Sequence, residues 1–577
     1  MTELAQTLSP APVAGVDFAS GAARARLKKR YRSEARFKAL GLAAVLVTAA
    51  FLVLLLADII RKGAPAFFEH RAQLSITLDP ATIDPKGTRE ISELRSADYQ
   101  ILVRAALIAQ FPEASDRRSR RELDRVLSSG AVDDLRSAVI ADPSIIGQTR
   151  SMPLLLSADA DLFMRQKSRL IERRKGAGPL HVEGEGANIS IAGGGNVFAV
   201  ALAEMKTLLA ARIRAATAEL AGLQAGGTSA TVDAKRAELE KDIAALQARA
   251  AAATSPETLT DREPSLIVAI GGGLLKITEI GSSEAKAVTL VPPKPGAIIT
   301  EWSLLKITTP ESNRRVSDRV AAWVETLSAR GLIENGFAWR FFTNGDSREP
   351  ELAGIRGALI GSALTLLVTL LLCVPIGVAA AIYLEEFAPK NRLTDILEVN
   401  INNLAAVPSI VFGLLGLAVF LNAFDLPRSA PLVGGLVLAL LILPTIIIAS
   451  RAALRAVPPS IKEAALGLGA SHQQAVFHHV LPLAMPGIMT GTIIGMAHAL
   501  GETAPLLMIG MVAFIVDIPQ AITEAATVLP VQIFLWSDLP ELAFQSRTAA
   551  AIIVLLGFLL VMNAAAVILR KMFERRW

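Results

Sequence analysis

An ionisable pair interrupts an otherwise apolar stretch near the end of the sequence. His498 and Glu502 are four residues apart, and Thr503 follows them. This spacing places both side chains on one face of a helix. Ionisable groups at membrane depth are costly and mark function by default, so a lipid-facing position is unfavourable. The pair indicates either the lining or gate of an anion path, or a His–Glu pair that satisfies itself within a helix bundle.

Neutral polar side chains lie at the mouth of an earlier apolar stretch. Asn400, Asn402 and Asn403 come first, and Ser409 follows directly after Pro408. Amide and hydroxyl groups can offer hydrogen bonds toward the interior of a helix bundle without carrying charge. Asn402, Asn403 and Ser409 are therefore further candidates for an anion path, with helix packing as the alternative.

Motifs for covalent chemistry are missing from the sequence. His472, His478 and His479 are spaced so that they do not share one helix face, and no cysteine or carboxylate set joins them into a metal site. The stretch GGGLLKIT (271–278) lacks the glycine that precedes lysine in a phosphate-binding loop, and GEGANI (184–189) lacks the third glycine of a dinucleotide site. We predict no catalytic residue, no metal ligand and no cofactor in this chain.

A polar connection at 458–482 interrupts two apolar stretches and has the pattern of a short helix, a turn and a second helix. Pro459 and Ser460 favour a helix start, and Glu463 can complete a capping box with Ser460. Ala464 and Ala465 leave a flat helix surface, Gly469 permits a sharp turn, and Leu481-Pro482 closes the second helix. Such a helix-turn-helix can dock into the groove of another protein.

The elements that position these residues are apolar runs long enough to cross a membrane. The chain has 577 residues, 52% hydrophobic and 19% charged, which suits a protein partly dissolved in lipid. Stretches of about 20 residues are needed for a helical span. Six qualify, at 37–60, 357–383, 401–424, 431–449, 483–511 and 549–569. The first is longer than a signal-peptide core, so we expect a retained helix.

Charge near the ends of the chain predicts its orientation. Basic residues cluster at 24–32 and 570–577, and a cationic excess beside membrane helices favours the cytoplasmic side. Both termini are therefore expected in the cytoplasm, with 61–350 outside it. A net charge of +5 concentrated beside spans suits membrane lipid rather than nucleic acid. The single cysteine, Cys373, lies within the second span and is expected to pack as a small apolar residue.

The segment between the first two spans is long enough for a folded domain. Apolar residues recur at helical spacing in 202–223 and again in 239–250, which predicts a helical hairpin. The stretches 265–281 and 286–296 are rich in β-branched residues divided by Gly and Pro, which predicts short strands. We therefore expect a cytoplasmic tail at 1–36, a first helix at 37–60, a mixed α/β insertion at 61–350, and an all-helical core at 351–577.

The connection at 458–482 resembles the cytoplasmic coupling loop of ABC-importer permeases. It shares Glu463-Ala464-Ala465, Gly469 and the final Leu481-Pro482, although His479 occupies a place that is hydrophobic in the family. The stretches VPSIVFGL and GETAPLL resemble the phosphate-specific permeases of the PstA type. Those permeases often have arginine where this chain has His498. The resemblance covers 337–577 and the first span but leaves the insertion unexplained.

This resemblance implies a six-span permease in the cell inner membrane that moves inorganic phosphate. The EAA residues and Gly469 would contact a dimer of ATPase subunits, and those subunits would hold ATP and Mg. A second, similar permease and an extracytoplasmic phosphate-binding protein would complete the assembly. Two alternatives remain: a permease for another oxyanion, and a membrane sensor that detects a ligand through the insertion.

Overall fold

The structure is a computed structural model that describes residues 21–184, 186, 188–225, 230–251, 256–293 and 301–573. The chain divides into two parts, 1–62 and 63–577. The first part consists mainly of α1 (Gly21–Gly63), in which the basic stretch at 24–32 continues directly into the apolar stretch at 37–60. Parts of several predicted segments lie outside the described residues, namely 1–20 of the basic tail, 185 and 187 of the GEGANI stretch, 226–229 between the paired helices, 294–296 after the predicted strands, and 574–577 of the basic end.

The insertion begins with a small antiparallel sheet. Strand β1 (Phe68–Thr77) pairs with β2 (Thr149–Leu155) on one side and with β11 (Ile333–Phe337) on the other. Alternate residues of β1, Ala72, Leu74 and Ile76, are buried against a set of short helices. These helices are α2 (Pro80–Ile83), α3 (Ile91–Ser96), α4 (Tyr99–Gln110), α5 (Arg117–Leu123), α6 (Gly130–Ala141) and α7 (Ala158–Leu170), with the 3-10 turn η2 (Pro143–Ile145).

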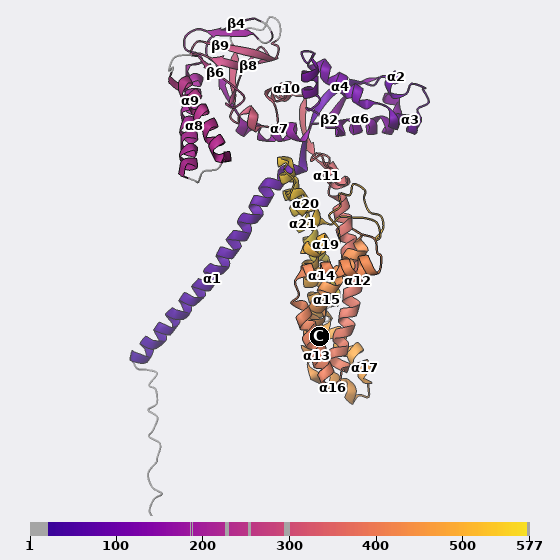
Figure 1. The fold of residues 1–577 in the computed structure, drawn as a ribbon. Coiled ribbons are helices and arrows are strands. Elements are labelled where there is room, and N and C mark those ends of the chain that lie inside the picture. The colour runs from indigo at the N-terminus through magenta and orange to yellow at the C-terminus, as the bar shows by residue number, and fades with distance from the viewer. Residues whose placement is uncertain are drawn as a thin grey trace, which may run out of the picture. The chain divides into compact units, whose positions relative to one another are not determined.

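A second, eight-stranded antiparallel sheet forms the other half of the insertion (Figure 1). Its strands are β3 (Ile171–Lys175), β4 (Leu180–Glu183), β5 (Ile189–Gly193), β6 (Glu257–Thr258), β7 (Ser265–Ile270), β8 (Gly273–Ile280), β9 (Glu284–Val291) and β10 (Trp302–Ile307). Gly271 and Gly272 join β7 to β8 with φ of 55° and 78°, backbone that favours glycine in a two-residue hairpin. The predicted strands at 265–281 are confirmed, as is the mixed α/β character of the insertion.

The predicted helical hairpin is also confirmed. It consists of α8 (Ala199–Ala225) and α9 (Ala230–Ala251), which pack against each other and are linked by a 2.8 Å ion pair between Glu219 and Lys235. The start of α8 covers one face of the larger sheet, where Phe198, Leu202 and Met205 are buried. Helix α10 (Asp318–Ala329) covers the other face and joins its core to that of the smaller sheet.

A buried charge cluster fixes the start of α10. Asp318 is 1% exposed and lies 2.6 Å from the Lys276 ammonium, and it also pairs with Arg314. Burial alone would raise the pKa of Asp318, but a hydrogen bond with Glu311 and the charges of Arg314 and Lys276 lower it from 3.8 to about 2. The insertion therefore contains an aspartate that is ionised throughout the ordinary pH range.

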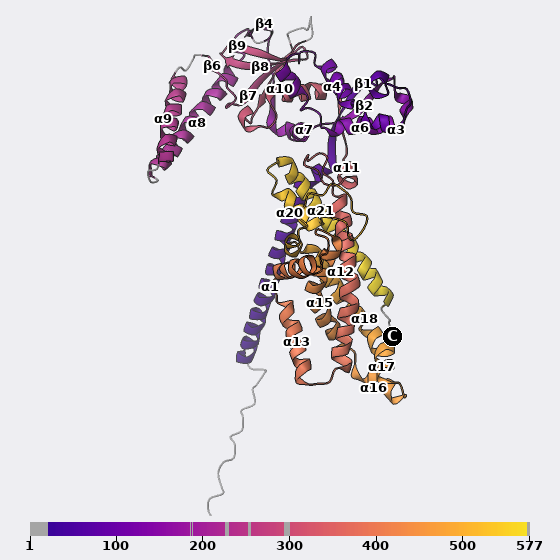
Figure 2. The same ribbon diagram turned by 45° about the vertical axis from the view of Figure 1, so that its right-hand side comes forward.

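The permease core is a bundle of long apolar helices. They are α12 (Arg356–Ile382), α15 (Pro431–Arg455), α18 (Leu481–Gly501) and α21 (Leu542–Phe573), with α13 (Arg392–Ala405), α14 (Ser409–Gly416) and α20 (Leu529–Ser537) between them. Helix α15 packs against both α12 and α18, and α21 packs against α18 and α20; Figure 2 shows α12 running along the length of the bundle. Cys373 is buried in α12, as expected. Among the described residues five helices are long and apolar enough to span, or six if the bent pair α13–α14 counts as one.

Two predicted spans are not continuous helices. The expected span at 401–424 bends by 100° between α13 and α14, because Pro408 has no N–H to donate and disfavours helical backbone at Val407. A π-helical segment, η5 (Leu417–Ala423), continues α14. The expected span at 483–511 ends at Gly501, and extended backbone at Glu502 leads into the short helix α19 (Ala504–Met508).

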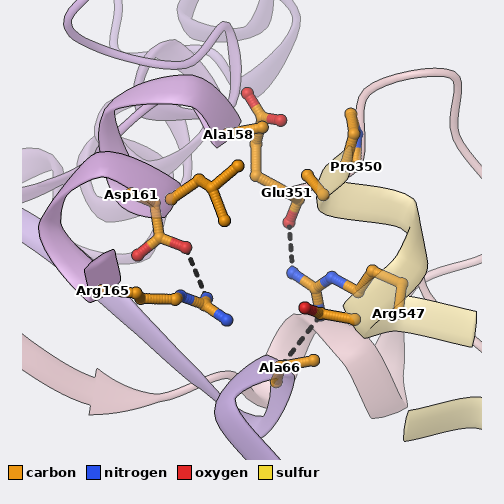
Figure 3. Close-up of a pocket in the computed structure, with 10 residues that line it drawn as sticks. Ala66, Ala158, Asp161, Arg165, Pro350, Glu351 and Arg547 are labelled. Carbon is orange, nitrogen blue, oxygen red and sulfur yellow. Dashed lines mark hydrogen bonds and ion pairs between the residues drawn. The ribbon is translucent and has the colours of Figure 1, made fainter. Parts of the chain in front are cut away.

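The insertion and the permease core meet around Arg547 at the start of α21 (Figure 3). Its buried guanidinium donates to the carbonyl oxygens of Ala66 and Glu351, each at 3.3 Å. Arg165 lines the same small pocket and forms an ion pair with Asp161. Backbone on both sides of the insertion, at 66 and 351, is thus bound to one core helix. The neighbouring connections are the 3-10 turn η1 (Ala64–Phe67) and the short helix α11 (Trp339–Thr343).

Candidate functional site

The first candidate site is the predicted coupling loop, which contains α16 (Pro459–Gly467) and α17 (His472–Ala475). The predicted capping box between Ser460 and Glu463 is wrong. Pro458 occupies the N-cap and Pro459 the first turn, so Ser460 lies inside the helix and makes no capping bond. Proline suits the first helical position because its φ is fixed near the helical value and its missing N–H would have no partner there.

A capping box occurs instead at the second helix of the loop. The Ser471 hydroxyl accepts from the backbone N–H of Gln474 at 3.3 Å, and the Gln474 side chain accepts from the N–H of Ser471 at 2.9 Å. Gly469 makes the turn before it with φ of 91°, in agreement with the predicted sharp turn. The N–H of Ala470 then reaches back to the carbonyl of Ala465, which ends α16.

The side chains of the coupling loop divide between exposed and inward positions. Glu463 and Ala464 are exposed, whereas Ala465 is buried against the chain itself. Within the described ranges the carboxylate of Glu463 forms no hydrogen bond or ion pair, so it is free for a partner. Leu468 is 91% exposed at the turn. Leu468 was not among the predicted site residues, although an apolar residue directly before a turn glycine was an available signal.

Leu481 and Pro482 do not close a helix, contrary to the prediction. The π-helical segment η6 (Val476–Val480) connects α17 to α18 without a break. Residues 472–501 therefore form one continuous span. Pro482 lies in the first turn of α18, where the change in hydrogen-bonding pattern at η6 accommodates a residue without an N–H. Both residues are half-buried within this helix.

Polar contacts tie the coupling loop to the end of α12. Helix α12 ends in a π-helical segment, η4 (Tyr383–Phe387). Glu386 within this segment forms an ion pair with Lys462 of α16. The backbone carbonyl of Glu386 also lies 2.8 Å from Nε2 of His472, whose ring packs edge-on against Phe387. Residues from both helices of the loop therefore meet one acidic residue, Glu386, that was not among the predicted site residues.

The neighbouring Glu385 extends these contacts to α15. Its carboxylate lies 2.8 Å from Arg455 and 3.4 Å from Arg451, and Arg451 lies 2.9 Å from Glu398 of α13. Carboxylates and cations alternate in this cluster, so each charge faces its opposite. The ends of α12, α13 and α15 and the coupling loop are thus joined by ion pairs at one end of the bundle.

The second candidate site contains the ionisable pair at the end of α18. Nε2 of His498 lies 2.8 Å from Oε1 of Glu502, so the predicted pairing is present. The two residues do not share an uninterrupted helix, because α18 ends at Gly501 and Glu502 is extended. The His498 side chain is 56% exposed and that of Glu502 is 18% exposed. Thr503 follows at the start of α19.

The two most distinctive sequence stretches, VPSIVFGL and GETAPLL, pack against each other. Helix α14 contacts α19, and a Cβ at Gly413 would lie 2.7 Å from Cα of Pro505 and 2.8 Å from Cβ of Met508. One turn later, Gly416 faces Ile509.

The predicted asparagine candidates lie in α13, the helix before the bend, and not in α14 or α19. Asn402 and Asn403 are exposed in the last turn of α13, before the bend, and Asn400 donates to the carbonyl of Ile396 within that helix. Ser409 is half-buried in the first turn of α14. Across the described ranges no group of three or more His, Cys, Asp or Glu side chains could hold a metal ion.

Family models match two parts of this chain. Residues 373–577 match the binding-protein-dependent transport system inner membrane component, and residues 24–171 match a domain of unknown function, DUF3333. The chain is 34% identical over 210 residues to a probable ABC transporter permease protein, YqgI, of Bacillus subtilis, covering 34% of this chain and 71% of the relative. The chain belongs to the binding-protein-dependent transport permeases.

A second relative within this family is the phosphate transport system permease protein PstA 1 of Mycobacterium tuberculosis. It is 31% identical over 254 residues, which cover 44% of this chain and 83% of the relative. Among solved structures, the MetNI methionine ABC transporter in inward-facing conformations matches with a TM-score of 0.31 and 17% identity, over 38% of this chain and 96% of that chain. This protein is thus a permease component of an inner-membrane ABC importer.

Proposed function

We propose that this chain is a transmembrane permease subunit of an ATP-driven importer of inorganic phosphate. The observation that supports the cargo is the similarity to PstA 1, a phosphate transport system permease, over 83% of that relative's length. The stretches that suggested phosphate in the sequence, VPSIVFGL and GETAPLL, form the packed contact between α14 and α19.

The coupling role is supported by the exposed side of the loop at 458–482. Glu463, Ala464 and Leu468 face away from the chain, whereas Lys462 and His472 face Glu386. One side of the loop is thus available for an ATPase subunit and the other is fixed to the membrane helices. ATP and Mg would be held by a dimer of such subunits, and this chain would supply no residue to hydrolysis.

Transport would proceed by alternating access with a second, similar permease. A phosphate-binding protein would deliver cargo from outside, and closure of the ATPase dimer would move the coupling loop. The anion would pass near His498, Glu502, Thr503 and Ser409, with Asn402 and Asn403 as further path candidates. Both termini would lie in the cytoplasm and 61–350 outside it. The His498 ring, paired with Glu502, would border this path.

Coupling is tested with the assembled transporter reconstituted in liposomes. We expect Glu463→Lys to abolish ATP-dependent uptake of labelled phosphate, because it places a cation where a free carboxylate faces the partner. Leu468→Ser should weaken ATPase binding, because burying a leucine contributes about 1.5–3 kcal/mol. Asp395→Lys makes the same change of charge on an exposed residue of α13 and should leave uptake unchanged. Normal uptake by Glu463→Lys in an intact assembly would refute the coupling role.

Cargo is tested separately by competition in the same liposomes. Unlabelled phosphate should inhibit uptake, whereas sulfate and molybdate should not. ATP-dependent uptake of sulfate or molybdate without phosphate uptake would identify a permease for another oxyanion. That result would refute the cargo while leaving the coupling role intact.

A further inference from the structure

A continuous row of aromatic rings leads from the interior of the protein to its surface where the insertion joins the core. Trp536 packs against Phe341 with 6.3 Å between ring centroids, and both rings are fully buried. Phe342 contacts Phe341 at 5.2 Å and stacks on Phe337 at 5.9 Å. Phe337 in turn contacts Trp339 at 4.8 Å. Each contact falls within the usual range for aromatic pairs, so the row is rigidly packed from its buried end.

The outer end of this row is exposed. Trp339 is 68% exposed, Phe337 is 39% exposed, and Phe68, which packs edge-on against Phe337, is 48% exposed. The indole N–H of Trp339 has no hydrogen-bond partner among the residues that the structure describes. Large apolar rings with an unpaired polar group suit an environment that is apolar on one side and wet on the other.

These exposed rings lie on the two connections through which the chain enters and leaves the insertion. Phe68 begins β1, Phe337 ends β11, and the two are register partners in the sheet. Helix α11, which begins at Trp339, is bonded directly to the start of α12, because the carbonyl of Phe341 accepts from the N–H of Ile355 at 2.7 Å. The rings therefore lie at the outer end of a membrane-spanning helix.

Helix α12 itself carries exposed apolar side chains farther along its length. Leu367 and Leu371 of α12 are 48% and 63% exposed, as expected of residues that face lipid. In the loop between α11 and α12, exposed Arg348 lies 5.6 Å above the ring of Phe514, which is itself 46% exposed. A cation and aromatic rings at the end of an apolar helix are the usual composition of a membrane–water interface.

We propose that Phe68, Phe337 and Trp339 form an anchor that inserts into the outer leaflet at the boundary between acyl chains and head groups. The occupant of this surface is lipid, because the rings lie at the end of a membrane-spanning helix that carries exposed leucines along its length. Since both connections of the insertion carry a ring, the anchor fixes the depth of both at once. The insertion is thereby seated on the membrane and does not swing freely on its two connections.

The test uses tryptophan fluorescence of the complete transporter in liposomes. The signal of Trp339 is the difference between the native protein and Trp339→Phe, a change that keeps an aromatic ring and should keep uptake. Phosphatidylcholine brominated near the head-group end of its acyl chains should quench this difference signal strongly, and lipid brominated at the chain ends should quench it less. Trp302→Phe supplies the control, because Trp302 is 7% exposed within the larger sheet and its difference signal should not respond.

Two results would overturn the anchor. Quenching of the Trp339 signal by aqueous iodide but not by brominated lipid would place the ring in water. Protection from both quenchers would mean that a protein partner covers it. As a second measurement, Phe68→Ser combined with Phe337→Ser should reduce quenching of Trp339 by brominated lipid at least twofold, whereas unchanged quenching would show that these rings do not set its depth.

Discussion

Removing the ion pair between Lys462 and Glu386 should loosen the coupling loop from the membrane helices and weaken its engagement with the ATPase. Lys462 is 29% exposed and Glu386 is 10% exposed, so solvent screens the pair only in part. The backbone carbonyl of Glu386 also lies within hydrogen-bond distance of the His472 ring. This contact keeps the second helix of the loop in place when Lys462 is changed. Lys462→Met therefore frees α16 while α17 stays attached.

The size of the effect follows from the burial of the two side chains. Exposed ion pairs contribute about 0.2–1 kcal/mol, whereas hydrogen bonds to charged groups contribute about 1.5–3 kcal/mol. Partial exposure of Lys462 places this pair between those ranges, at about 1–2 kcal/mol. If the bound loop requires the paired arrangement, ATPase affinity should fall by roughly five- to thirtyfold, since 1.4 kcal/mol corresponds to a factor of ten.

The assay is titration of purified ATPase subunits onto permease in lipid nanodiscs. Lys462→Met and Glu386→Gln should each weaken binding, and the double variant should be little worse than either alone, because both remove one interaction. The charge swap Lys462→Glu with Glu386→Lys should recover most of the affinity. Lys390→Met serves as control. Lys390 is an exposed lysine in the connection between α12 and α13, and the described part of the chain gives it no ionic partner. Additive losses in the double variant, or a swap that recovers nothing, would refute the reasoning.

Three further predictions concern the helix contact, the insertion and the ionisable pair. Gly413→Ala should destabilise the core by about 1–3 kcal/mol, because its Cβ would overlap Pro505. Gly557→Ala should not destabilise it, because Gly557 has open space around it. Thermal unfolding in detergent distinguishes the two variants. Asp318 has a folded pKa of about 2, below its value of 3.8 in an open chain, so its stabilisation, of order 2 kcal/mol, is present above pH 4 and lost as pH falls toward 2. Hydrogen exchange of α10 should show this loss in the native protein and not in Asp318→Asn. If a positive charge at position 498 attracts the anion, His498→Arg should keep or raise uptake at fixed pH and His498→Gln should lower it; equal uptake by the two variants would refute the role.

Local sequence patterns predicted the elements that depend on residues close to one another in the sequence. The helical hairpin followed from apolar spacing, and the β7–β8 turn followed from Gly271 and Gly272. Both depend on neighbours a few residues away. The cytoplasmic or external side of each segment rests on charge distribution alone and stays a prediction.

The errors arose where a local rule competed with backbone geometry. Ser460 has the right neighbours for a capping box, but two preceding prolines start the helix earlier. The stretch around Pro408 is apolar enough for a straight span, yet hydropathy does not register a missing N–H. Glu386 carried no motif that marked it, since its importance comes from Lys462 and His472, 76 and 86 residues away.

Helix continuity suggests how movement at the coupling loop would reach the anion path. Residues 472–501 form one span of 30 residues, about 45 Å at 1.5 Å per residue, with His472 at one end and His498 near the other. A push on this helix is transmitted along its length, because it contains no break after η6. The extended backbone at Glu502, between α18 and α19, is the first place where the chain can yield. Beyond it, Pro505 of α19 lies against Gly413 of α14 without room for a methyl group, so displacement of α19 must move α14 as well. The two broken helices would therefore move as one unit beside the His498–Glu502 pair, and the bend at Pro408 would allow α14 to do so while α13 stays fixed by Glu398 and Arg451.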